Sequence, residues 1–200
     1  MKRNRQAGFS LLEMLVVVAI ALAAFSLAYV NAQDTIQDSH VSAAYTSTLE
    51  AMRQARETAV SQCRIYILTF TAPGTITVAP QNPGVSDLNL KITLPGDVSF
   101  DAEPSLPNTK ATVPDGIGLG AATGAINFDV NVGAGGSNVI YFWPDGSARD
   151  VNGNVNDGIV YLARPGSVTT SRAVTLRGLT GRLRGWRLVP NGAATQWTRI

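Results

Sequence analysis

The chain has 200 residues, of which 45% are hydrophobic, and its formal net charge is +2 at pH 7. This length suits one domain of ordinary size with an appendage. The single cysteine excludes an internal disulfide framework, and the single histidine lacks the partners of a typical zinc site.

Charge is distributed unevenly along the chain. Three basic residues precede residue 8, whereas no Asp or Glu follows Asp157. Seven arginines lie beyond that point: Arg164, Arg172, Arg177, Arg182, Arg184, Arg187 and Arg199. This asymmetry predicts a basic C-terminal edge.

Residues 9–30 form an apolar stretch close to the roughly 20 residues that span a bilayer. A secretory signal peptide has a shorter apolar stretch, of about 7–15 residues. The basic residues before it favour a cytoplasmic N-terminus. A plain membrane anchor fits these features, but it leaves Glu13 unexplained, because a carboxylate inside a membrane segment is costly.

Residues 6–21, with the sequence QAGFSLLEMLVVVAIA, resemble the processing motif of the type IV prepilin superfamily. The resemblance implies that a prepilin peptidase cuts after Gly8 and so removes residues 1–8 as a leader. It implies that Phe9 is then N-methylated, and that Glu13 meets the amine of Phe9 in a neighbouring filament subunit. Electrostatics agrees, since the helix dipole favours an acid in the first turns, and pairing with a cationic amine offsets the cost of a charge in lipid.

Residues 31–63 are more polar and predict an amphipathic helical stem. No Pro or Gly occurs from Phe9 to Ala72, so one helix from about Ser10 to about Cys63 is expected, about 80 Å long. We interpret His40 as a solvated stem residue and Cys63 as a small buried hydrophobe. The apolar stripe expected to pack on the head is Ile36, Val41, Tyr45, Leu49, Met52, Ala59, Val60 and Cys63, interrupted by Arg56.

Residues 64–200 predict a β-rich head. Short runs of β-branched and aromatic residues alternate with turn sequences such as APG, LPGD and WPDG, which is typical of an antiparallel sheet or sandwich. The expected fold class is therefore α+β, a long N-terminal helix packed on a β-rich antiparallel head, with long loops at about 80–89 and 101–125. The predicted strands are 64–70, 75–78, 90–94, 126–130, 138–143, 158–163, 172–178 and 181–189.

Three segments of this region resemble the GspH/FimT-type pseudopilins. The first, LEAMRQARETAVSQCRIYIL (49–68), carries an alanine–arginine pair at Ala55 and Arg56. The second, IYFWPDGSA (140–148), resembles a strand followed by an aspartate–glycine turn. The third, AVTLRGLTGRLRGWR (173–187), holds a glycine-arginine-x-arginine motif at residues 181–184.

The arginine-rich end is a candidate DNA-binding strand. The period of a strand places Arg182, Arg184 and Trp186 on one face, with Arg187 on the other. Arginines beside an aromatic side chain can contact phosphates and stack on bases. The same motif in some FimT-type proteins is implicated in DNA uptake. A subunit interface or a solubilised edge strand is the alternative interpretation.

No catalytic or metal-binding arrangement is predicted, and no cofactor is expected. The loop 150–158 alternates possible oxygen ligands, but Val155 and Tyr161 stand where a calcium-binding EF-hand needs Gly and Glu. A solvated asparagine–glycine turn is the preferred interpretation.

The expected protein is a minor pilin or pseudopilin, a structural subunit of a type IV pilus or a type II secretion pseudopilus. Its expected partners are prepilin peptidase, other major and minor pilins or pseudopilins, and the inner membrane. It would pass the inner membrane once, with the head in the periplasm, and assemble near the filament tip. A DNA-binding minor pilin that takes up double-stranded DNA for transformation and a signal-anchored periplasmic domain are the alternatives.

Overall fold

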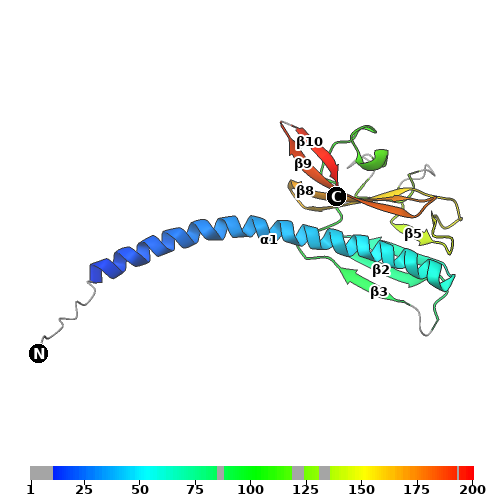
Figure 1. Cartoon of the computed structure of the whole chain (residues 1–200), viewed down its shortest axis with the longest axis horizontal. Helices are drawn as coiled ribbons and strands as arrows, with labels where there is room; N and C mark the ends of the chain where they lie inside the picture. Colours follow the sequence, from blue (N-terminus) through cyan, green and yellow to red (C-terminus); the bar gives the residue numbers. More distant parts are fainter. Residues whose placement is uncertain (1–10, 85–87, 119–123, 131–135, 193) are drawn as a thin grey trace, which may run out of the picture. The chain divides into compact units, whose positions relative to one another are not determined.

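The computed structural model describes residues 11–84, 88–118, 124–130, 136–192 and 194–200, without the side chains of residues 27–28 and 30–34. The chain divides into two compact units, one ending at Gln37 and the other comprising Asp38–Ile200. The helix α1 (Leu11–Gln62) belongs to both units and confirms the predicted single helix (Figure 1). The stem from residue 38 onward is thus part of the same compact unit as the head.

Cys63 ends α1 in a left-handed conformation, with φ of 51°. The Arg64 amide donates to the Ala59 carbonyl at 3.1 Å, and the Cys63 amide donates to the Val60 carbonyl at 3.3 Å. These two bonds form a Schellman motif, in which Gly is the usual residue at the position of Cys63. The prediction that Cys63 is buried was wrong: it is exposed, because this terminating position faces solvent.

Two antiparallel five-stranded sheets form the head. The first has the order β3-β2-β1-β5-β6 and the second the order β10-β9-β8-β7-β4, with a short 3₁₀ turn η1 (Pro114–Gly116) in the long loop between β3 and β4. The bounds in the first sheet are β1 Tyr66–Thr71, β2 Thr75–Pro80, β3 Leu90–Thr93, β5 Val139–Phe142 and β6 Ala148–Arg149. Those in the second are β4 Ile126–Asn127, β7 Gly158–Arg164, β8 Ser167–Arg177, β9 Arg182–Asn191 and β10 Ala194–Arg199.

Each of the eight predicted strands overlaps a strand of the structure, but two strands were missed. The first missed strand, β6, has only two residues and so leaves no periodic signal. The second, β10, carries one buried side chain, Trp197, among Thr, Gln and Arg, so its alternation is weak. The predicted strand at 126–130 is ordered as β4 only over its first two residues.

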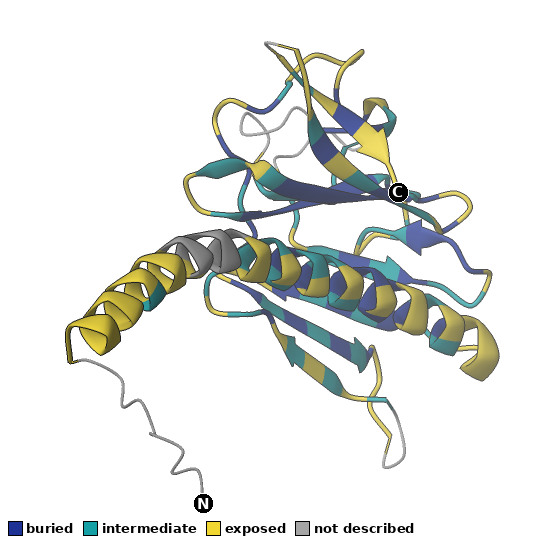
Figure 2. Ribbon diagram, turned by 60° about the vertical axis from the view of Figure 1, so that its left-hand side comes forward, coloured by how far each residue is buried: buried dark blue, intermediate teal, exposed yellow. Residues whose placement is uncertain are grey.

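The stem of α1 packs against strands of both sheets. Its buried stripe includes Val41, Ala44, Met52, Ala55 and Ala59, which share one core with side chains of β1, β2, β5, β7 and β8. Figure 2 shows buried, intermediate and exposed residues alternating along the stem. The alanines let the helix approach the strands closely, and the burial of this stripe stabilises the compact unit. Ile36 and Val60, which were predicted to lie in the stripe, are 54% and 44% exposed.

A second hydrophobic cluster lies on the second sheet beneath part of the long loop. Ala102, Leu106 and Ile117 of that loop pack with Tyr161 and Trp197 of β7 and β10. The predicted loop at 101–125 therefore contributes buried side chains over part of its length, and the 3₁₀ turn η1 is the regular element within its described residues.

Gly185 of β9 lies directly against the stem. A Cβ atom at this position would be 1.6 Å from the Tyr45 hydroxyl oxygen. Burial raises the pKa of the Tyr45 hydroxyl, which is consistent with this close helix–strand contact. The position therefore requires glycine for space.

Gly185→Ala is expected to lower the free energy of unfolding by about 1–3 kcal/mol, the usual cost of an overpacked contact. Chemical denaturation of residues 38–200 measures it. Gly96→Ala is the control, since no atom lies within 4 Å of its added Cβ. Adding Tyr45→Phe should recover part of the loss, and equal stability of the two single glycine variants would contradict the packing argument.

Candidate functional sites

Glu13 lies in the first turn of α1 and is exposed. An acid in a first helical turn is stabilised by the helix dipole. The predicted cleavage and methylation sites, Gly8 and Phe9, lie outside the described residues, so the structure places neither of them relative to Glu13.

Large apolar side chains follow Glu13 on every side of the helix and are exposed. Leu15 is 64% exposed, Leu22 65% and Phe25 72%. A helix that is apolar all round requires apolar surroundings, which the described residues do not provide for this part of α1. Within the part of the chain that the structure describes, no helix is long and apolar enough to span a membrane.

The four residues of the candidate DNA-binding strand have different environments. The face predicted to hold Arg182, Arg184 and Trp186 is formed, because β9 is continuous through all three. Arg182, at the start of β9, is exposed, and among the described residues its guanidinium has no ion-pair partner. Arg187 lies on the opposite face, as predicted from the strand period.

Arg184 and Trp186 are held by contacts within the head. The Arg184 guanidinium forms an ion pair with the carboxylate of Asp115, whose side chain is only 5% exposed. Asp115 also accepts a hydrogen bond of 2.6 Å from the Thr175 hydroxyl, and the Trp186 indole N–H donates to that hydroxyl at 3.1 Å. Arg184 therefore fastens the η1 turn to the second sheet.

Arg187 lies beside a second ion pair, at the start of the compact unit. The buried Arg172 guanidinium donates to Asp38 at 2.9 Å, and Arg187 approaches the other oxygen of Asp38 at 3.6 Å. Burial lowers the pKa of Arg172, while Asp38 opposes that shift. These contacts connect α1 to β8 and β9, so the structure does not gather the four predicted residues into one open arginine–tryptophan surface.

Arg56 organises a junction that sequence periodicity did not predict. Its Nε donates to the Gly146 carbonyl at 3.0 Å and its Nη2 donates to the Thr180 carbonyl at 3.2 Å. Gly146 lies in the turn after β5, and Thr180 lies in the turn before β9. Gly181 completes the junction, since a Cβ there would be 2.0 Å from the Gly146 carbonyl oxygen and 2.4 Å from Arg56 Nε.

The junction joins the three segments that carry the resemblance to GspH/FimT-type pseudopilins. Arg56 belongs to the first segment, Gly146 to the second, and Thr180 and Gly181 to the third. The arginine that interrupts the apolar stripe is thus used to connect the helix to turns from both sheets.

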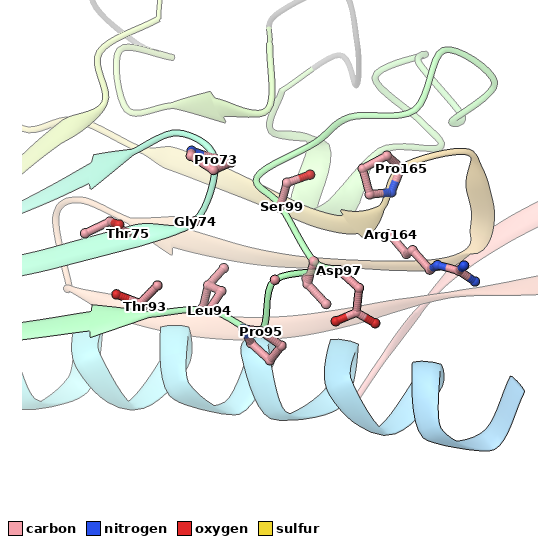
Figure 3. Close-up of a pocket in the computed structure, with 12 residues that line it drawn as sticks. Pro73, Gly74, Thr75, Thr93, Leu94, Pro95, Asp97, Ser99, Arg164 and Pro165 are labelled. Carbon is pink, nitrogen blue, oxygen red and sulfur yellow. The ribbon is translucent and has the colours of Figure 1, made fainter. Parts of the chain in front are cut away.

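A pocket of about 460 Å³ lies beside the loop that follows β3 (Figure 3). It is lined by Pro73, Thr93, Pro95, Asp97 and Arg164, among others. The Asp97 carboxylate lies 2.9 Å from Nδ1 of His40 on the stem. His40, which was predicted to be solvated, is therefore half-exposed and paired with Asp97. No group of three or more His, Cys, Asp or Glu suited to a metal ion occurs among the described residues.

The loop after β6 forms an Asx-type turn. One oxygen of Asp150 accepts the backbone amides of Asn152 and Asn154 at 2.9 and 2.8 Å, and the other accepts the Asn154 side-chain amide at 3.0 Å. These hydrogen bonds, led by that from the Asn154 side chain, lower the pKa of Asp150. This geometry supports the asparagine–glycine turn preferred from the sequence.

Comparison with known families gives a match to the N-terminal part of the chain. Residues 3–29 match the prokaryotic N-terminal methylation motif. The match supports a type IV pilin-like precursor that prepilin peptidase processes, anchored in the membrane and assembled with other pilins, and such proteins are structural subunits rather than enzymes. No curated protein and no solved structure matches the chain.

Arg184→Gln is expected to lower the melting temperature of residues 38–200, whereas Arg182→Gln should leave it nearly unchanged. Breaking a fully buried ion pair costs about 3–5 kcal/mol, and the loss here should be smaller because Arg184 is 23% exposed. Differential scanning calorimetry measures both variants. Equal melting temperatures would show that the pair with Asp115 does not hold the η1 turn.

Proposed function

We propose that this chain is a minor pilin or pseudopilin of the GspH/FimT type, built into a type IV pilus or a type II secretion pseudopilus near the filament tip. The match to the methylation motif carries the proposal. The position of Glu13 at the start of a helix with exposed apolar side chains on all sides supports it. The subfamily rests on the three resembling segments, which meet at Arg56.

Cleavage after Gly8 would leave a free α-amino group on Phe9, with an ordinary pKa of about 7.7–8.0. That amine is largely protonated at neutral pH and can form an ion pair with a carboxylate in apolar surroundings. Pairing offsets the roughly 2.5–3.5 kcal/mol cost of a charge at the centre of a membrane helix. The carboxylate of Glu13 in an incoming subunit would meet the amine of its neighbour, and this pairing would set the register of the two helices.

The first part of α1, up to about residue 30, would form the filament core, while the stem stays packed on the head. Its apolar side chains would be covered by lipid before assembly and by neighbouring helices afterwards. The head would then contribute its surface to contacts with other subunits. The proposed role of the protein is therefore structural, and none of its steps requires a cofactor.

Glu13→Ala should still be cleaved after Gly8 and inserted in the membrane, but its amount in sheared filaments should fall at least about tenfold, because the amine of Phe9 loses its partner. Glu50→Ala, which removes an exposed carboxylate from the stem of the same helix, is the matched control. N-terminal sequencing and immunoblotting of membrane and filament fractions measure both steps. Normal incorporation of the Glu13 variant would refute this role.

DNA capture is a second candidate function, supported by the exposed guanidinium of Arg182 and by the 47% exposure of Arg187. Binding of a DNA duplex by residues 38–200 should weaken steeply with salt, because phosphate contacts release counterions. Arg182→Gln should weaken it at low salt, with Arg53→Gln on the stem as the control. An unaltered affinity in fluorescence anisotropy would remove Arg182 from this function.

A further inference from the structure

The four edges of the two sheets differ in how they are protected. The first sheet ends at β3, which carries the exposed Lys91, and at β6, which has two residues and is followed by a bridge from Arg149 to Val155. The second sheet ends at β4, also of two residues, and at β10. Short strands and a central lysine are the usual means of blocking a sheet edge.

The edge strand β10 lacks this protection. It has six residues, and its sequence ATQWTR places its only charge, Arg199, at the end. Thr and Trp favour extended structure, and no Pro or Gly interrupts the strand. Figure 1 shows β10 beside β9 at the edge of the second sheet. Among the described residues, β10 is therefore the one long edge without a central charge.

The register determines which backbone groups of β10 face outward. The Ile200 amide donates to the Gly185 carbonyl at 3.0 Å, and antiparallel pairs alternate between bonded and non-bonded positions. The pairs Thr195–Pro190 and Trp197–Leu188 are then non-bonded positions, which suits Pro190 because it has no N–H. The N–H and C=O groups of Thr195, Trp197 and Arg199 consequently point away from β9 and are available to another strand.

A cavity adjoins the same strand. It has a volume of about 490 Å³, and its lining includes Trp186, Gln196, Trp197 and Lys110. Trp197 is only 6% exposed, yet its indole N–H donates no hydrogen bond among the described residues. An unpaired buried donor is costly, so Trp197 beside this cavity carries a polar group that no described residue satisfies.

The charges around β10 select the partner. Arg199 is exposed on the strand, Arg187 is 47% exposed on β9, and Lys110 is exposed at the cavity. No acid follows Asp157 in the sequence, so no carboxylate of β8, β9 or β10 offsets Arg199, whereas Arg187 already lies 3.6 Å from Asp38 of the stem. An extended segment with acidic side chains is complementary to this edge, whereas a second copy would bring its own basic edge against it.

We propose that β10 is a docking edge for an extended, acid-bearing segment of a different filament subunit, which adds a strand to the second sheet and places a side chain in the adjoining cavity. This inference rests on the proposed filament function. Main-chain hydrogen bonds would supply affinity, while the cavity and the arginines would supply specificity.

The test uses the full chain in the cells that make the filament, with a photoreactive p-benzoylphenylalanine at Thr198. Cross-linked peptides are mapped by mass spectrometry, and a probe at Lys91 of β3 is the opposite-edge control. Thr195→Pro removes an outward N–H without breaking the pairing with β9, and Thr195→Val keeps that N–H. Arg199→Glu reverses the charge without touching the ladder, and Arg53→Glu on the stem is its control.

The probe at Thr198 should cross-link to an Asp- or Glu-containing segment of another filament subunit. The cross-linking yield should fall about tenfold in Thr195→Pro and in Arg199→Glu. It should change less than about twofold in the control variants Thr195→Val and Arg53→Glu. A cross-link to a second copy or to DNA, an equal yield from Lys91, or yields unaffected by both variants would overturn the proposal. Should Thr195→Pro lower the melting temperature, Arg199→Glu decides alone.

Cleavage of the leader distinguishes a failure of the docking edge from a failure of the proposed filament function. A chain that is cut after Gly8 and found in filaments, but that gives no β10 cross-link, refutes the docking edge and leaves the filament function intact. A chain that is never cut and never enters filaments refutes the proposed function, and the docking edge with it.

Discussion

The close packing of the α1 stem against both sheets is the constraint on which the head depends. Alanines at positions 44, 55 and 59 bring the helix close to the strands, and Gly185 leaves room for Tyr45. The Arg56 guanidinium then joins turns of the two sheets through their carbonyls. The stem cannot leave the head without exposing the core that it shares with the strands. On the proposed function, the helix that would enter a filament at its N-terminal end therefore also determines the structure of the head.

The arginines of the C-terminal strands illustrate how a basic composition can serve a fold. Arg172 pairs with Asp38 and Arg184 with Asp115, so both are used to attach the helix and the η1 turn to the second sheet. Arg182 and Arg199 remain exposed. The basic character of this edge is therefore partly structural, and the exposed arginines are the ones that can select a partner.

The helix, the α+β class and most strands were predictable because their signals are local: a long stretch without Pro or Gly, and β-branched runs between turn residues. The fate of particular side chains was not, because it depends on partners far away in the sequence. Arg184 meets Asp115 and His40 meets Asp97, and neither spacing has a periodic signature. Cys63 was mistaken for a buried residue because a left-handed helix end is normally marked by Gly. Strand β10 was not predicted because a partly exposed edge strand needs few apolar residues, and so its sequence shows little alternation.

The central claim is that residues 1–8 are a leader whose removal gives Phe9 a methylated, positively charged terminus. Intact-mass analysis of the chain purified from cells with and without prepilin peptidase tests this most directly. The account predicts a chain that begins at N-methylated Phe9 when the peptidase is present, and an intact chain from Met1 when it is absent. Recovery of the same unmethylated chain beginning at Met1 from both cells would contradict it.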